Sequence, residues 1–340
     1  MLIEKRLTAQ LLAGSPARDP VFVVEQLLAI QGQDARGVRL AIRARSTGLT
    51  AADVDRALTE ERSLLITWLN RGTLHLVCRE DYPWLQALTT PRILALNARR
   101  LSQEGVTPSL AEKGAAVIER CLAEEGPLTR AQLGERIASA DVPTKGQALV
   151  HLLMLAALRG LTVRGPMIDG EHAYVLVRDW LGKPEPIDRR RALAALARRY
   201  LAGHGPASER DLAKWAGLPL RDARVGLIAI ASALDVRRDG LVDLAGGAAA
   251  APLPPPRLLG AYDPLLMGWK SREPFLGSNQ NLVTSNGLFR PFALVRGRAA
   301  ATWSLQAGEI ALEPFRRISR RDLSALKRDS ADVVRFLGAS

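Results

Sequence analysis

Residues 126–133 read GPLTRAQL, and residues 205–212 read GPASERDL. In both stretches a Gly-Pro pair precedes a hydroxyl residue, a preferred helix N-cap, and a short helix then begins with Leu at the same position. Each stretch lies between two longer predicted helices: 109–124 and 145–159 around the first, 188–201 and 220–234 around the second. An internal repeat of this kind indicates tandem units of one supersecondary type.

Each repeat ends in a predicted β-hairpin. The first has β-rich runs at 161–164 and 172–177 about Asp169-Gly170, and the second has a small hairpin around residues 237–240. The N-terminal part has the same order in a less regular form. Its predicted helices are 3–13, 19–30 and 50–58, its hairpin strands are 64–69 and 73–77, and residues 38–45 fit either a helix or a strand. Helices followed by a hairpin are typical of a winged helix, so we predict three of them, at 1–105, 106–184 and 185–248.

A change in composition marks the last predicted domain, residues 249–340. Residues 246–256 are rich in glycine, alanine and proline, which is typical of a linker. Short β-like runs separated by glycine turns follow, and they predict a small barrel or sandwich. A closing helix is predicted at 320–337. The predicted fold class is therefore α+β and mainly α, with three tandem winged helices before a small β domain.

Charge is the most unusual feature of the composition. The 340 residues include 47 Lys and Arg against 35 Asp and Glu, a formal net charge of +12, and the pI is near 10.4. Such an excess favours a polyanionic partner such as nucleic acid. Forty of the basic residues are arginine, which suits phosphate and base edges, although an Ala- and Arg-rich chain also arises from a GC-rich genome.

Other classes of protein are disfavoured. Cys78 and Cys121 are the only cysteines and have no metal-ligand spacing, so we expect neither a disulfide framework nor a zinc site. The first residues lack the apolar core of a signal peptide, and the longest apolar run, 148–158, is too short to span a bilayer. We therefore expect a cytoplasmic, nucleoid-associated protein without a metal or cofactor.

A Gln-Gly-Gln tripeptide, Gln31 to Gln33, follows the apolar run 21–30 and precedes Asp34. In a helix the two glutamines would point to different faces, but in an extended segment they share one face. Gly32 and Gly37 are the residues we expect to let the backbone leave the helix. The tripeptide thus permits a paired-amide site, although by itself it fits an ordinary polar helix end better.

Four segments resemble the AlkZ/YcaQ family of bacterial DNA glycosylases. They keep their order along the chain and cover both of its ends: 28–37, 67–77, 258–269 and 286–303. The resemblance implies tandem winged helices with a C-terminal β-barrel. The family's catalytic signature, Gln, a usually aliphatic residue, then Gln or Asp, falls on Gln31 and Gln33, with Gly32 in place of the usual alanine. Gln at the last position is typical of the AlkZ-like branch, which is associated with bulky N7-alkylguanine lesions and crosslinks.

Two amides suit such a substrate. Glutamine is too weak a base to generate hydroxide, but its carbonyl orients a water and faces positive charge that develops on the sugar. Alkylation at N7 makes the purine a cationic leaving group that needs no general acid. Asp34 would face away from the amides in an extended segment, so we interpret it as a structural cap.

The predicted function is thus a monofunctional DNA glycosylase that hydrolyses the N-glycosidic bond of N7-alkylguanine, acts as a monomer on double-stranded DNA and serves repair or self-resistance. The alternative is a non-catalytic winged-helix transcriptional regulator. Candidate DNA-binding residues come from the hairpins and from the C-terminal domain: Arg36, Arg71, His75, Arg164, Arg178, Trp269, Lys270, Arg272 and Arg290. For His75 a hydrogen-bonded strand position is the other reading.

Overall fold

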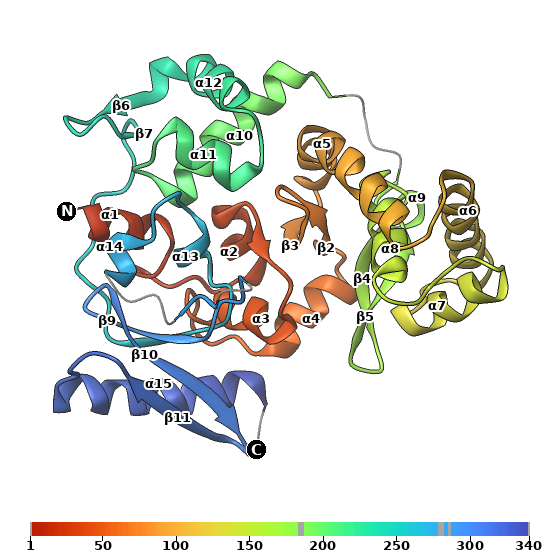
Figure 1. Ribbon diagram of the computed structural model, residues 1–340. Helices are drawn as coiled ribbons and strands as arrows, with labels where there is room; N and C mark the ends of the chain where they lie inside the picture. The colour runs from red at the N-terminus through yellow and green to blue at the C-terminus, as the bar shows by residue number, and fades with distance from the viewer. Residues whose placement is uncertain (1, 183–186, 278–281, 285–286, 339–340) are drawn as a thin grey trace. The chain divides into compact units, whose positions relative to one another are not determined.

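A computed structural model describes residues 2–182, 187–277, 282–284 and 287–338. The fold is mixed α and β, mostly helical, with several small antiparallel sheets (Figure 1). Two compact units divide the chain. The terminal unit contains Met1–Val54 and Leu193–Ser340, and the middle unit contains Asp55–Ala192. In the described ranges no helix is long and apolar enough to cross a membrane.

The middle unit contains two of the three predicted hairpins, and both are confirmed. Their strands are β2 (Leu64–Leu69), β3 (Thr73–Cys78), β4 (Thr162–Ile168) and β5 (Glu171–Leu176). The hairpins join edge to edge in the order β3-β2-β4-β5, where Ile66 pairs with Arg164. Because β2 is a central strand of this sheet, all six of its residues are buried.

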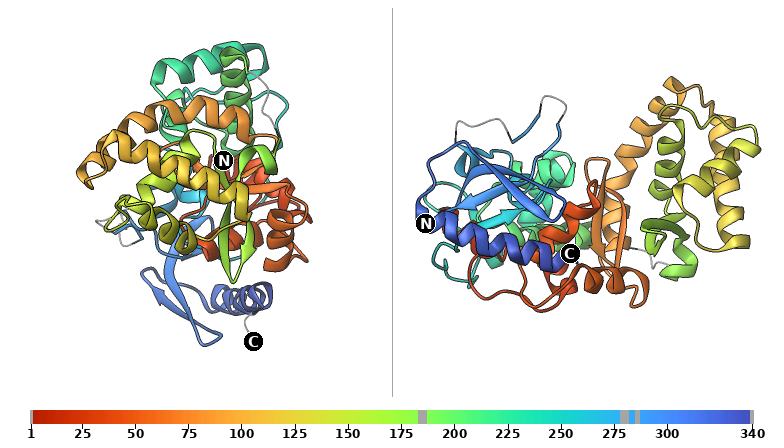
Figure 2. Two further views of the ribbon diagram at one scale, coloured as in Figure 1. Left: turned by 90° about the vertical axis from the view of Figure 1, so that its right-hand side faces the viewer. Right: turned by 90° about the horizontal axis from the view of Figure 1, so that it is seen from below.

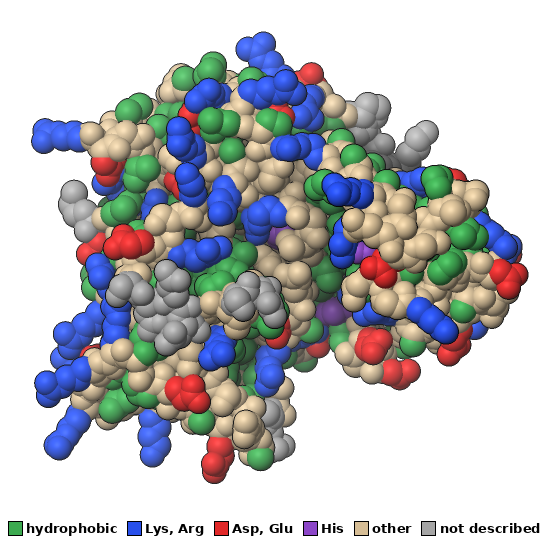
Figure 3. All heavy atoms as spheres, in the orientation of Figure 1, with side chains coloured by type: hydrophobic (Ala, Val, Ile, Leu, Met, Phe, Trp, Pro, Cys, Tyr) green, Lys and Arg blue, Asp and Glu red, His purple; other side chains and the backbone are tan. Residues whose placement is uncertain are grey.

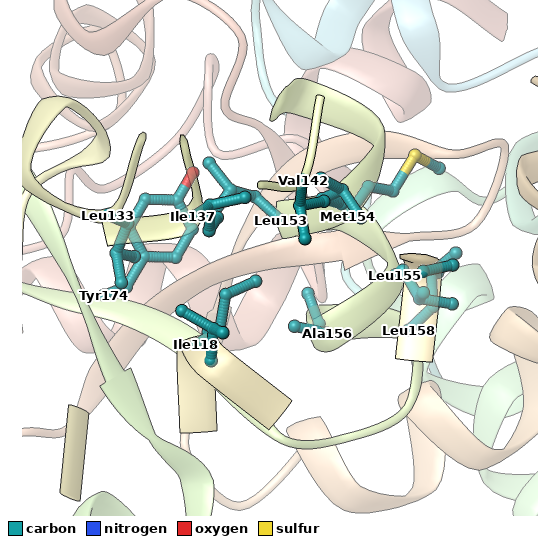
Figure 4. Packing of buried hydrophobic residues seen from close by; sticks show 14 of the residues in the cluster. Ile118, Leu133, Ile137, Val142, Leu153, Met154, Leu155, Ala156, Leu158 and Tyr174 are labelled. Carbon is teal, nitrogen blue, oxygen red and sulfur yellow. The ribbon is translucent and has the colours of Figure 1, made fainter. Parts of the chain in front are cut away.

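Four helices build the core of the middle unit: α5 (Tyr82–Gln103), α6 (Pro108–Glu125), α7 (Arg130–Ser139) and α8 (Ala148–Leu158). The apolar α8 packs against α5, α6 and β2, which explains why polar residues are almost absent from it. Figure 4 shows Ile118, Leu133 and Ile137 packed around Tyr174 and residues of α8. At the start of α7 the predicted cap is confirmed, since Thr129 and Gln132 exchange hydrogen bonds as a capping box.

The second copy of the repeat lies mainly in the terminal unit. Its elements are α10 (Arg189–His204), α11 (Glu209–Ala216), α12 (Leu220–Ala229), β6 (Leu234–Val236) and β7 (Val242–Leu244). Ser208 caps α11 by accepting from the amide of Asp211, and the carboxylate of Asp211 in turn accepts from the Ser208 amide. A buried aromatic cluster of Tyr200, His204 and Trp215 then fixes α11 on α10.

The N-terminal helices of the chain are α1 (Leu2–Ala9), α2 (Pro20–Leu27), α3 (Ala35–Arg43) and α4 (Ala51–Thr59). Residues 38–45, which fit a helix or a strand, are thus mostly helical. Arg6 of α1 lies with its guanidinium carbon 4.5 Å from the ring centroid of Trp269, and its Nε donates to the carbonyl of Pro206. This buried arginine ties α1 to the second repeat and to the C-terminal segment.

The C-terminal part contains β8 (Arg257–Leu259), α13 (Pro264–Met267), α14 (Glu273–Leu276), β9 (Phe292–Val295), β10 (Arg298–Gln306), β11 (Glu309–Pro314) and α15 (Arg320–Leu337). The prediction of a barrel is wrong for the described residues. Their strands form an open sheet in the order β11-β10-β9-β8, in which β11 and β8 are unjoined edges. Instead of closing, the sheet buries Trp303 and Ala301 against Leu326 and Val333 of α15, which runs along it in Figure 2.

Candidate active site and nucleic-acid interface

The helix that precedes the Gln-Gly-Gln segment, α2, ends at Leu27. This end lies three residues earlier than predicted. Asp19 caps the start of α2, and Leu28 ends it with φ of 65°. The left-handed conformation therefore falls on Leu28, and our expectation that Gly32 supplies it is wrong. A leucine rarely adopts this conformation, and such backbone strain tends to occur at functional sites. Ile30 and Gln31 then run extended as β1.

Gln31 and Gln33 meet, as the extended geometry predicts. Gln31 Nε2 donates a hydrogen bond to Gln33 Oε1 over 2.5 Å. Gln31 is 6% exposed, whereas Gln33 is exposed to solvent. With this bond made, Gln33 retains its NH₂ group and the second lone pair of its oxygen for other partners. The pair therefore combines a buried, positioned amide with one that solvent or a ligand reaches.

Asp34 acts as the structural cap that the sequence predicts. Its backbone is extended, and its carboxylate accepts from the amide of Gly37 in the first turn of α3. Gly37 lies inside α3 and has a role other than the predicted one. A Cβ at Gly37 would come 2.5 Å from the carbonyl oxygen of Ala261, so only glycine permits this close approach of the C-terminal segment.

Two buried arginines fasten α3 to the C-terminal part of the terminal unit. Arg45 and Asp263, both with fully buried side chains, form a two-pronged salt bridge at 2.8 and 2.9 Å. Arg43 donates to the carbonyl of Leu258 and pairs with Asp329 of α15, each at 2.9 Å. The position of the amide pair relative to residues 258–263 therefore depends on both arginines.

A hollow of about 530 Å³ lies beside Asp34. Its described lining comes from the start of α3, the segment after β8, the segment before β9 and the end of β10, and includes Arg36, Tyr262, Phe289 and Arg290; Asn286 of the resembling segment is outside the described residues. Tyr262 has φ of 56° and its ring lies 5.5 Å from that of Phe289. Partial burial and then the charge of Asp34 raise the pKa of Tyr262 above its ordinary value. The hollow thus offers aromatic faces flanked by cations.

His75 belongs to the middle unit, in β3, where it pairs with Thr67 of β2. Burial, and then the charge of Arg71, lower its pKa to about 3, so the ring is neutral at ordinary pH. The carbonyl of Thr73 lies 2.8 Å from Nδ1 and only accepts, so Nδ1 carries the proton. A neutral ring gives phosphate no charge to bind, so His75 matches the alternative reading, a hydrogen-bonded strand residue.

The predicted DNA-binding residues differ in how accessible they are. Arg36, Lys270 and Arg290 are exposed, and Arg71 is half-buried in the turn between β2 and β3. Arg272 lies 4.8 Å from the ring centroid of Phe289, and its Nε donates to the carbonyl of Leu266. Other candidates are engaged within the protein: Arg164 with Trp68 and Tyr174, Arg178 with Glu119, and buried Trp269 with the carbonyl of His204. Figure 3 shows many Lys and Arg side chains on the terminal unit, with few Asp and Glu between them.

The sequence missed Tyr262 and the Arg45–Asp263 pair as parts of this site. Both Tyr262 and Asp263 fall within the resembling segment 258–269, and an Asp followed by Pro264 is a helix-start pattern. Asp263 does cap this helix, as its carboxylate accepts from the amide of Leu265. Nothing in the local pattern, however, signals that its partner is an arginine 218 residues away.

The sequence profile of the family described as DNA glycosylase AlkZ-like matches residues 24–336. The chain therefore belongs to the AlkZ-like DNA glycosylase family. It is 27% identical over 347 residues to an interstrand DNA cross-link repair glycosylase of Streptomyces sahachiroi, a match that covers 94% of this chain and 91% of the relative. The solved structure of Streptomyces sahachiroi DNA glycosylase AlkZ has the same fold, with a TM-score of 0.79 at 22% identity over 100% of this chain and 96% of that one.

Proposed function

We propose that this protein is a monofunctional DNA glycosylase that releases bulky N7-alkylguanine, including guanine held in interstrand crosslinks. The observation that carries the proposal is the hydrogen-bonded pair of Gln31 and Gln33 at the point where the chain leaves α2. The relationship to a cross-link repair glycosylase supports the choice of lesion. We also propose that the predicted units 1–105, 106–184 and 185–248 act as winged helices on duplex DNA.

The reaction needs a leaving base, a water and a stabilised sugar. When the bond between C1′ and N9 breaks, its electron pair passes to N9 and neutralises the cationic 7-alkylguanine. Water attacks C1′ and loses a proton to solvent, which leaves free base and an abasic site. The amide oxygens of Gln31 and Gln33 act on the positive charge that develops at C1′ and orient the water. Neither amide has to gain or lose a proton, so the chemistry suits a base that is already charged.

The hollow beside Asp34 fits the bulky part of the lesion. Tyr262 and Phe289 offer aromatic surface to a planar or apolar substituent, and Arg36 and Arg290 are placed for the phosphates around it. Asp34, which lines this hollow, follows Gln33 directly in the chain. A substituent projecting from N7 would thus enter the hollow while the sugar stays at the amide pair.

The decisive experiment is base release from a duplex with a single N7-alkylguanine, at neutral pH and with enzyme in excess. We expect Gln31→Ala and Gln33→Ala each to lower the single-turnover rate by about 10²-fold or more, because a preorganised dipole is lost from the transition state. Gln103→Ala is the matched control, since Gln103 is an exposed glutamine at the end of α5 whose amide oxygen accepts a hydrogen bond from Arg100. All variants must keep the wild-type melting temperature and duplex affinity.

A neutral lesion tests the mechanism separately. A duplex with O6-alkylguanine presents a similar substituent without the positive charge, and we expect no release from it above the spontaneous rate. Release of both lesions at similar rates would refute the paired-amide mechanism. Binding of duplex DNA without release of any alkylated base would instead favour the regulator.

A further inference from the structure

A second hollow, of about 740 Å³, lies at the other end of β10 from the one beside Asp34. It is lined by the turn from β9 to β10, the segment after β11 and the start of α15. Five arginines line it: Arg296, Arg298, Arg316, Arg317 and Arg320. We call it the arginine hollow. Asp322 is the one carboxylate among its described lining residues.

The charges of the arginine hollow are only partly balanced by the protein. Asp322 pairs with Arg296 at 3.3 Å, and its carboxylate also accepts from the hydroxyl of Ser319. Within the described ranges, no carboxylate pairs with Arg298, Arg317 or Arg320, and all three are exposed. Three cations thus share one concave space without an internal counter-ion, and such a space concentrates anions.

The backbone around the arginine hollow is held in place. The amides of Phe315 and Arg316 both donate to the carbonyl of Ala300, at 3.0 and 3.2 Å. The guanidinium of Arg316 donates to the carbonyl of Leu276 at 2.9 Å. The arginines therefore extend from fixed points around the space. Planar guanidinium groups in such a setting match the oxygens of a phosphate, often through two parallel hydrogen bonds.

We propose that the arginine hollow binds the phosphodiester backbone of duplex DNA at a distance from the base that is released. Ala299 lines the arginine hollow and Ser304 lines the hollow beside Asp34. Five residue-to-residue steps along the strand separate them, a span of about 17 Å, which is the length of about five base pairs. The arginine hollow therefore contributes affinity for the duplex and leaves the bond-breaking step unchanged. Where the arginine hollow lies relative to the lesion rests on the proposed function, whereas its binding of the DNA backbone does not.

The first test is the salt dependence of binding to an undamaged duplex, measured by fluorescence anisotropy. The variant carries R298Q, R317Q and R320Q. The control carries R136Q, R159Q and R224Q, which remove the same charge from arginines that already pair with Glu125, Glu112 and Glu209. We expect the slope of log K against log salt to fall by about 2 to 3 in the variant, since each phosphate contact contributes about 0.9. A slope equal to that of the control would overturn the proposal.

The second test uses four duplexes that each carry one lesion. The lesion lies three or twelve base pairs from the left end in two of them, and three or twelve base pairs from the right end in the other two. We expect wild type to lose affinity when one particular flank is short, and the R298Q/R317Q/R320Q variant to bind all four duplexes alike. At saturating enzyme the variant should release base at the wild-type rate, whereas a rate as low as that of Gln31→Ala would place the arginines in the chemistry and overturn the proposal. If the protein releases no base at all, the proposed function fails, but the salt test on undamaged DNA still decides whether the arginine hollow binds the backbone.

Discussion

The burial of His204 leads us to expect that the protein loses stability in mild acid. Its ring is fully buried, stacked 4.8 Å from Tyr200 and near Trp215, and its Nδ1 lies 3.2 Å from the carbonyl of Tyr200. Desolvation is the main cause that lowers its pKa from 6.5 to about 3. The unfolded chain therefore takes up a proton near pH 6.5 that the folded chain refuses until about pH 3. Stability must fall as the pH drops through this window and change no further below it.

The magnitude follows from the size of the shift. Each pH unit below 6.5 costs about 1.4 kcal/mol per histidine, so at pH 5 His204 removes about 2 kcal/mol of unfolding free energy. His75 has the same lowered pKa of about 3 and adds a similar amount. The two together predict a loss of about 4 kcal/mol between pH 7 and pH 5, a large part of the stability of an ordinary domain.

Urea unfolding at pH 7 and pH 5, followed by tryptophan fluorescence, measures this loss. The variant His204→Phe keeps an aromatic ring but cannot titrate, so about half of the pH dependence should disappear, whatever the variant's stability at pH 7. The carboxylates titrate alike in wild type and in His204→Phe, so their contribution to the pH dependence cancels when the two proteins are compared. An identical pH dependence in wild type and His204→Phe would refute the reasoning.

Two further predictions concern the contacts that hold α3. Asp263→Asn leaves the guanidinium of Arg45 buried without its counter-ion, and we expect a loss of about 3 to 5 kcal/mol in urea unfolding; a loss below about 1 kcal/mol would show that the pair is dispensable. Gly37→Ala forces a methyl group against the carbonyl oxygen of Ala261, and we expect both a loss of about 1 to 3 kcal/mol and slower base release; a variant as stable and active as wild type would contradict the close approach.

Local chemistry was predictable from the sequence. The caps at Thr129 and Ser208 formed as expected, because an N-cap depends only on residues within three positions of itself. Asp34 formed its predicted cap for the same reason. The closing helix was also predicted within its observed bounds, since its apolar positions recur at the helical period.

Features that depend on distant residues were not predictable. Leu28 adopts a left-handed conformation that no local pattern indicates for a leucine, so the end of α2 was misplaced. The C-terminal strands were recognised as strands, but whether their edges meet depends on what covers them. With α15 packed on Trp303 and Ala301, the sheet buries its apolar face without closing. The meeting of Gln31 with Gln33 was the exception, because alternation along an extended chain is itself a local rule.

The candidate catalytic residues depend on both ends of the chain. All five N–H groups of Arg45 are used: two bonds reach Asp263, two reach Gln10 and one reaches the carbonyl of Ala41. A buried ion pair of this kind adds less net stability than its geometry suggests, but it penalises any arrangement in which one partner is missing. The pair therefore fixes α3, and with it Asp34, against the segment that carries Tyr262. The amide pair at residues 31–33 and the hollow beside it are thus held by residues more than 200 positions later in the chain.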